Sequence, residues 1–147
     1  KSKNFNLSEE DYILLISKKT ASLFSCCCKL GSISSGNKDL NEIEAFGNYL
    51  GIIFQIKDDL FDFTTKRIGK PTKSDLKSQK ITLPLIFSIK QSTYQDKKAI
   101  KAIYDNGPFF EDPKLQSTYL DIMRPYIDLI IAGKELQVNN KNVELYI

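Results

Sequence analysis

Hydrophobic residues recur at spacings of three and four in two long runs of the chain, the repeat of helices that bury one face. The first run follows Ser8 and Asp11, which have the pattern of a capping box, and Gly31 is a natural stop for its helix. The second run predicts a long helix from about Leu40 to Phe63. Glycines and serines crowd the segment between the runs. The pattern therefore predicts two consecutive helices joined by a loop.

This periodicity fails over residues 64–80, where Gly69 and Pro71 would end any helix, so a second loop is predicted there. Residues 81–89 are apolar again and predict a helix that holds Pro84 in its first turn. The loop thus separates two helical parts of the chain.

The last third of the chain shows further helical patterns. One returns over residues 96–104, and Asp112 as N-cap with Pro113 at the first helical position predicts another helix. Pro125 must kink or end that helix. No strand-like alternation is long enough to compete with these helices. The predicted fold class is therefore all-α.

Length and composition bound the class of protein. The 147 residues are 41% hydrophobic and 27% charged, which is enough for the core of one domain. The net charge of +3 is too small to indicate a nucleic-acid-binding protein by itself. Histidine is absent, which excludes catalytic triads with a His base. Any metal must then be held by carboxylates, which select a hard cation.

Other sequence features favour a reducing cytoplasm. No stretch approaches 18 uninterrupted apolar residues, and no apolar leader follows the N-terminal charges, so we expect a soluble cytoplasmic chain with no transmembrane segment. The three cysteines, Cys26, Cys27 and Cys28, are consecutive, which suits neither a disulfide framework nor a usual zinc site. We interpret them as buried or half-buried helix residues, with a reactive or metal-binding thiol as the alternative.

Aspartates at the end of the second predicted helix are the clearest candidates for chemistry. Asp58 and Asp62 lie four residues apart on one helical face, with Gln55 one turn upstream and Asp59 turned by about 100°. The like charges repel, and the helix dipole disfavours anions at a C-terminus. A bound cation would offset both effects. Oxygen ligands without His or Cys predict Mg²⁺, which proteins commonly share with substrate phosphates.

The loop after these aspartates carries charge of one sign. Residues 64–80 contain six basic residues and one acidic residue, Asp75. A metal on the carboxylates and lysines in the loop would together suit a polyphosphate ligand. Lys18, Lys19 and Thr20 in the first helix are a second candidate anion contact. The basic residues of the loop are Lys66, Arg67, Lys70, Lys73, Lys77 and Lys80.

The same residues also have simpler interpretations. A DDxxD pattern also occurs by chance on solvated helix ends. An EF-hand calcium loop counted from Asp58 fails, because Phe63 stands in place of its glycine and Gly69 in place of its last glutamate. Nucleic-acid binding by the basic loop would leave three carboxylates facing the same polyanion, so no nucleic-acid partner is predicted.

Taken together, the motifs resemble the second aspartate-rich region of the trans-isoprenyl diphosphate synthases, the polyprenyl synthetase family. The matching pieces are GIIFQIKDDLFD at residues 51–62, GKP at 69–71, Asp75, and KITLPL at 80–85. Upstream, Lys19-Thr20-Ala21 matches the family's KTA triplet. The resemblance covers roughly residues 8–90, and the order and spacing of all these pieces are specific to the family.

The resemblance implies an all-α helical bundle of the isoprenoid synthase type and a Mg²⁺-dependent prenyltransferase, commonly a homodimer. In that family an allylic prenyl diphosphate ionises, the double bond of isopentenyl diphosphate attacks the cation, and a proton is lost to the released diphosphate. Carried over by position, the metal ligands would be Asp58, Asp59 and Asp62, the lysines on the allylic diphosphate Lys19, Lys70 and Lys80, and the residues beside the reacting carbons Thr20 and Gln55.

The family's first DDxxD motif lies upstream of its KTA helix and has no counterpart among residues 1–11. The resemblance therefore implies that residues 1–147 are the C-terminal part of a polyprenyl synthetase domain, which we expect to be inactive alone. Three alternatives stay open: a class I terpene cyclase, a catalytically inactive helical partner subunit of a synthase, and a helical domain that binds RNA or a membrane surface.

Overall fold

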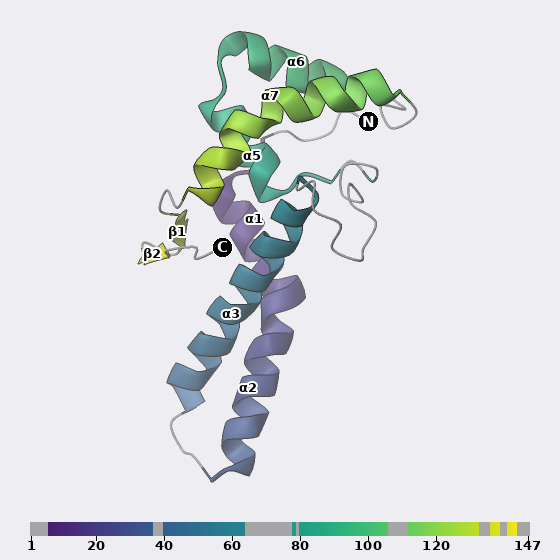
Figure 1. Ribbon diagram of the computed structural model, residues 1–147. Helices are drawn as coiled ribbons and strands as arrows, with labels where there is room; N and C mark the ends of the chain where they lie inside the picture. The colour runs from purple at the N-terminus through teal and green to yellow at the C-terminus, as the bar shows by residue number, and fades with distance from the viewer. Residues whose placement is uncertain are drawn as a thin grey trace. The chain divides into compact units, whose positions relative to one another are not determined.

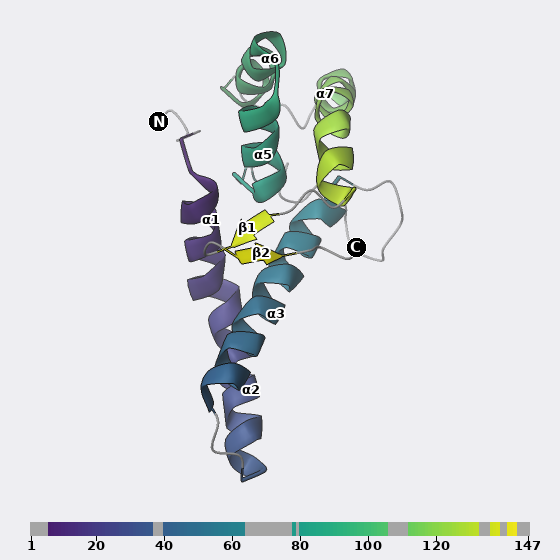
Figure 2. The ribbon, with the colours of Figure 1, turned by 90° about the vertical axis from the view of Figure 1, so that its left-hand side faces the viewer.

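A computed structural model describes residues 6–36, 40–63, 78, 80–105, 112–132, 136–138 and 141–143, and helices dominate it (Figures 1 and 2). The predicted all-α class is confirmed, with one short antiparallel hairpin of two strands that the sequence did not predict. In chain order the elements are α1 (Glu9–Ile16), the π-helix η1 (Ser17–Ala21), α2 (Ser22–Ser34), α3 (Leu40–Phe61), α5 (Leu83–Gln91), α6 (Tyr94–Asp105), α7 (Pro113–Ile131), β1 (Leu136–Val138) and β2 (Lys141–Val143).

The first helical segment begins where the capping pattern predicts, with α1 starting directly after Ser8. Its predicted stop at Gly31 is wrong, because α2 continues to Ser34. The backbone turns out of the helix at Gly36 instead, whose φ of +79° lies in the left-handed region that glycine adopts without strain. A glycine inside a helix weakens it without ending it, whereas a left-handed residue does end it.

The later helices follow the predicted local signals. In α5, Pro84 occupies the first turn, and the buried hydroxyl of Ser88 donates to the Pro84 carbonyl at 2.7 Å. Asp112 caps α7, since its Oδ1 accepts a hydrogen bond from the Lys114 amide at 2.8 Å. Pro125 lies inside α7 and does not end it; the helix runs on to Ile131 and bends along its length (Figure 1).

The chain divides into two compact units, one formed by Glu10–Asp58 and the other by the described residues on either side of that segment. In the second unit, α5 and α6 pack with each other and with α7. Ser88 and Tyr119 are completely buried there, as is most of the apolar face of α5. The buried apolar residues of these three helices include Leu83, Leu85, Ile86, Ile89, Ile100, Tyr104, Tyr119, Met123, Ile127 and Ile130.

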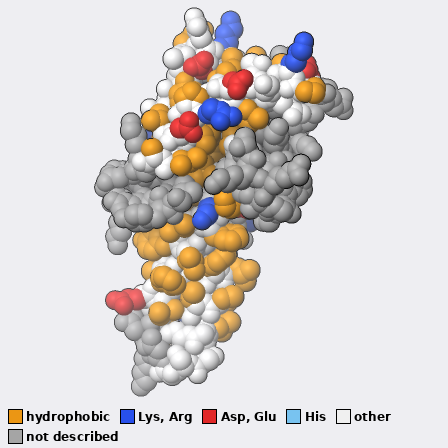
Figure 3. Space-filling view, viewed as in Figure 1, with side chains coloured by type: hydrophobic (Ala, Val, Ile, Leu, Met, Phe, Trp, Pro, Cys, Tyr) orange, Lys and Arg blue, Asp and Glu red, His pale blue; other side chains and the backbone are white. Residues whose placement is uncertain are grey.

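The Glu10–Asp58 unit is dominated by α2 and α3, which run side by side in opposite directions (Figures 1 and 2). Its buried residues include Ala21 and Ile52, with 0% and 2% of their surface exposed. Hydrophobic side chains also gather on the visible surface of both helices (Figure 3). Leu23 on α2 is 66% exposed and Phe46 on α3 is 59% exposed.

The cysteines on α2 differ from their prediction. Cys26 and Cys27 are exposed and only Cys28 is half-buried, and all three are free thiols. Consecutive helix positions point in different directions, and the buried side of α2 here falls on Ser25 and Ser32 instead. Within the described residues, no helix is both long enough and apolar enough to cross a membrane.

Candidate active site

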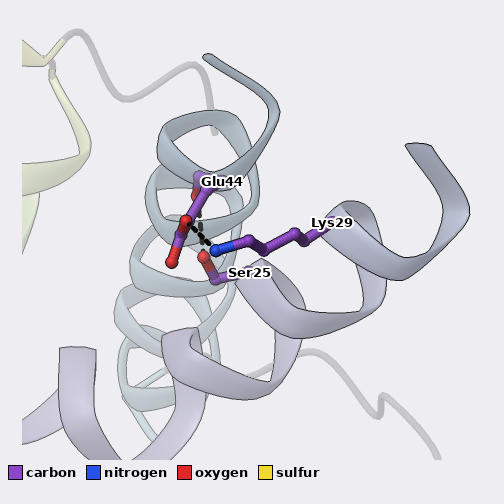
Figure 4. Close-up of polar contacts among 3 residues, drawn as sticks. All are labelled: Ser25, Lys29 and Glu44. Atoms are coloured by element: carbon purple, nitrogen blue, oxygen red, sulfur yellow. Dashed lines mark hydrogen bonds and ion pairs between the residues drawn. The ribbon is translucent and has the colours of Figure 1, made fainter. Parts of the chain in front are cut away.

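Polar contacts join α2 to α3 near the ends of the two helices that the loop between them connects (Figure 4). The buried Ser25 hydroxyl donates to the backbone carbonyl of Glu44 at 2.8 Å. Lys29 Nζ lies 2.6 Å from Glu44 Oε2, but both side chains are at least 40% exposed, so this ion pair contributes little to stability. The Ser25 bond therefore does more than the ion pair to fix how the two helices face each other.

At the other end of this helix pair, a hydrogen bond joins two residues that the sequence predicts for the site. Thr20 Oγ1 donates to Gln55 Oε1 at 2.8 Å, from η1 to α3 across 35 positions of sequence. The bond is partly buried, so water competes with it less than at an open surface. Because it uses the only hydroxyl proton of Thr20, the lone pairs of that oxygen stay available to a third group.

Thr20 lies in a π-helical turn, which interrupts the helical path from α1 to α2. The Ser22 amide donates to the Ser17 carbonyl five residues earlier, and the Ser22 hydroxyl donates to the Lys18 carbonyl at 2.8 Å. Single π-turns inside helices are uncommon and occur often at functional sites. Lys19, the neighbour of Thr20 in this turn, is exposed and so is accessible to an anion.

The three aspartates at the end of α3 have different environments. Asp58, one turn after Gln55, is partly exposed, whereas Asp59 and Asp62 are only 3% and 8% exposed. Asp62 follows the last residue of α3. Within the described ranges, no three acidic or cysteine side chains gather as ligands around one point.

These residues are suited to bind Mg²⁺ through one or two carboxylates. The ion keeps several waters and is usually bound through one or two carboxylates together with substrate phosphates, so it does not need a cage of three. The donor set here is oxygen only, as Mg²⁺ prefers. Asp58 is the most accessible of the three carboxylates and hence the first candidate ligand.

Lys80 belongs to the other unit, and its side chain is exposed. Its backbone carbonyl accepts a hydrogen bond from the buried Tyr104 hydroxyl of α6 at 3.4 Å. The Tyr104 ring lies 5.8 Å from that of Tyr119 in α7, and Tyr119 lies 6.4 Å from Phe63, the residue after Asp62. The aromatic row Phe63–Tyr119–Tyr104 thus links the segment after α3 to Lys80.

Sequence reasoning missed this aromatic row. Tyrosines at helical spacing are read most simply as core, and Tyr119 is in fact fully buried. That burial raises the pKa of the Tyr119 hydroxyl well above its ordinary value of 10.0, and the neighbouring Tyr104 raises it further.

Four of the predicted site residues lie in the Glu10–Asp58 unit: Lys19, Thr20, Gln55 and Asp58. Within it the structure brings Thr20 to Gln55, with Asp58 one turn farther along α3. Asp59, Asp62 and Lys80 lie in the other unit, and Lys70 lies outside the described residues, as do the other lysines of the basic loop up to Lys77.

Comparisons with known proteins give a consistent result. A family model described as polyprenyl synthetase matches residues 1–122. The chain is 34% identical to the geranylgeranyl diphosphate synthase of Saccharolobus solfataricus over an alignment of 155 positions, which covers 95% of this chain and 46% of that protein. Over 96 residues it is 38% identical to heptaprenyl diphosphate synthase component 2 of Geobacillus stearothermophilus, covering 63% of this chain and 29% of that protein.

Solved structures agree with the sequence relatives. The fold is similar to that of a decaprenyl diphosphate synthase from Rhodobacter capsulatus, with a TM-score of 0.71 and 29% identity over 84% of this chain and 38% of that one. The chain therefore spans less than half the length of the relatives it matches.

Proposed function

Since the chain belongs to the polyprenyl synthetase family, we propose that it acts as a Mg²⁺-dependent prenyltransferase that condenses isopentenyl diphosphate with an allylic prenyl diphosphate. The observation that supports this best is the Thr20–Gln55 hydrogen bond with Asp58 one turn farther along α3. It places two uncharged oxygen groups next to a carboxylate. This arrangement suits a reaction in which positive charge forms on carbon and negative charge leaves on diphosphate.

The oxygen groups have a defined role in this proposal. With its proton committed to Gln55, the Thr20 oxygen presents lone pairs to the developing allylic cation. A fixed dipole of this kind stabilises charge without having to reorient during the reaction. Neither group is charged, so neither would combine irreversibly with the cation as an anionic carboxylate would.

The diphosphate end of the substrate needs cationic groups. Asp58 would hold the metal ion, with Asp59 and Asp62 as further candidates. When bound, Mg²⁺ neutralises charge on the departing diphosphate. Lys19 and Lys80 are exposed and carry flexible cationic side chains that would bind its remaining oxygens, as would Lys70.

The finer parts of the proposal come from family membership. They are a cytoplasmic homodimer, and no turnover by residues 1–147 without the first aspartate-rich motif. A second candidate is a role as one component of a two-chain synthase, since the Geobacillus stearothermophilus relative is named as a component. The two candidates share the Mg²⁺-dependent diphosphate site and differ in whether a second, different chain is required for turnover.

The experiment is a calorimetric titration of the full-length protein with inorganic diphosphate, first with Mg²⁺ and then with EDTA. We expect binding that needs Mg²⁺ and that falls at least tenfold in Asp58→Asn. The matched control is Glu42→Gln, an exposed carboxylate on the same helix. Binding that is indifferent to EDTA, or equal loss in both variants, would contradict the site. Incorporation of labelled isopentenyl diphosphate, with and without a partner chain, then separates the two candidates.

A further inference from the structure

Beside the Thr20–Gln55 hydrogen bond the backbone of α3 lies unusually close to those of η1 and α2, and two glycines of α3 allow that approach. Gly47 and Gly51 are four residues apart and so share one face of α3. At Gly51, an added Cβ would lie 2.5 Å from Ala21 Cα and 2.9 Å from Ala21 Cβ. At Gly47 it would lie 2.7 Å from Ser25 Cα. The helices therefore meet backbone against backbone.

This glycine seam, formed by Gly47 and Gly51 against Ser25 and Ala21, lies next to the candidate site. Ala21 is the residue after Thr20, and Gly51 lies one turn before Gln55 on α3. The contact between Ala21 and Gly51 is thus adjacent to the hydrogen bond in both helices. The Ser25–Glu44 bond fixes the seam on the other side of Gly47.

The distances leave no space for a side chain at Gly51. Carbon atoms in ordinary contact lie about 3.5 Å apart or more, so a Cβ at position 51 would move the backbones apart by about 1 Å. A hydrogen bond of 2.8 Å stretched by that amount is no longer one. Shifts of this size in a catalytic group also lower rates by about a hundredfold in some enzymes.

We propose that Gly51, with Gly47, is a positioning residue that holds Thr20 against Gln55 by letting α3 touch the π-turn and the first part of α2 through their backbones. The inference rests on the proposed function, because it gives that hydrogen bond a part in the reaction. It concerns the geometry of the pair and assigns no contact with substrate to either glycine.

The test is a double-mutant cycle in the full-length protein with Gly51→Ala, Thr20→Val and the double variant. If Gly51 acts through the hydrogen bond, Thr20→Val shifts the urea unfolding equilibrium by about fivefold in the parent and by less than twofold in Gly51→Ala. In the same way, kcat falls about tenfold or more in each single variant, and the double variant is no slower than the slower single one.

If Gly51 only supports the fold, the double-mutant cycle gives a different result. The two losses would then multiply, both in the unfolding equilibrium and in kcat, and this would overturn the proposal. Gly31→Ala is the matched control, because it is also a helix glycine but a Cβ there meets nothing within 4 Å. We expect it to leave kcat and the effect of Thr20→Val unchanged.

Two further results would also bear on the proposal. If Gly51→Ala does not fold, Gly47→Ala takes its place in the cycle, since its clash at 2.7 Å opens the same seam one turn farther from Gln55. The effect of Thr20→Val should then fall to half or less, and an undiminished effect counts against the proposal. If the full-length parent transfers no prenyl group either alone or with a partner chain, the proposed function fails, while the urea cycle still decides whether the glycines position the pair.

Discussion

The Tyr104 hydroxyl donates to the backbone carbonyl of Lys80 at 3.4 Å, so a core helix holds the main chain of a residue whose side chain is exposed. The bond is long and hence weak. Its position matters more than its strength, because it fixes the backbone just before α5 begins. A buried tyrosine thereby limits where the Lys80 ammonium group can reach.

We expect Tyr104→Phe to weaken Mg²⁺-dependent binding of inorganic diphosphate by about threefold and to lower the unfolding free energy by no more than about 1 kcal/mol, the usual contribution of one hydrogen bond. Calorimetry and urea titration measure the two effects. Tyr94→Phe is the control, since Tyr94 is 82% exposed. Unchanged diphosphate binding in Tyr104→Phe would mean that the carbonyl contact does not restrain Lys80.

Alkaline pH tests the burial of Tyr119. Its pKa is raised in the folded state above the ordinary value of 10.0, chiefly by burial, so folding favours the neutral phenol. That contribution to stability is fully present below pH 10 and is lost as pH rises above it. We expect the unfolding free energy to fall more steeply above pH 10 in the parent than in Tyr119→Phe. A Tyr94→Phe variant should keep the parent's slope.

The aspartates at the end of α3 should separate into binding and structural roles. Asp59 is only 3% exposed, so Asp59→Ala should lower the unfolding free energy by about 1–3 kcal/mol. Asp58 is partly exposed, and Asp58→Ala should cost less than about 0.5 kcal/mol while removing diphosphate binding. Urea titration of both variants checks the ranking, and the reverse order would be evidence against Asp58 as the accessible ligand.

Two glycines in the same segment should respond oppositely to alanine. Gly36 has a φ of +79°, where a side chain costs about 1–2 kcal/mol, so Gly36→Ala should destabilise the protein. Gly31 lies inside α2 with open space around it, and Gly31→Ala should stabilise it by about 0.5–1 kcal/mol through helix propensity. Thermal denaturation of the two variants would show shifts of opposite sign.

Local chemistry explains which parts of the fold could be predicted from the sequence. The start of α7 follows from Asp112 and Pro113 alone, because a cap needs only neighbouring residues. The stop at Gly31 was wrong because the signal for a helix end is a backbone conformation, which Gly36 adopts and Gly31 does not. The hairpin β1–β2 was missed because strands of three residues show too little alternation.

The candidate site was predictable in part for a similar reason. Thr20 and Gln55 could be chosen by resemblance, but their hydrogen bond depends on how two helices pair, which no local pattern encodes. The four-residue spacing of Gly47 and Gly51 is the sequence signal that indicates such a close pairing. Tyr104 acts through its hydroxyl on a distant backbone carbonyl, and no sequence motif marks such a contact.

The glycine seam also restricts how the protein can change over evolutionary time. A Cβ at Gly51 would first meet Ala21 Cα, and one at Gly47 would first meet Ser25 Cα, so in both cases the nearest atom belongs to the backbone. A smaller side chain on the facing helix would therefore not make room for a larger residue at either glycine. Both positions should stay glycine among descendants of this chain, which keeps the spacing of Thr20 and Gln55 constant.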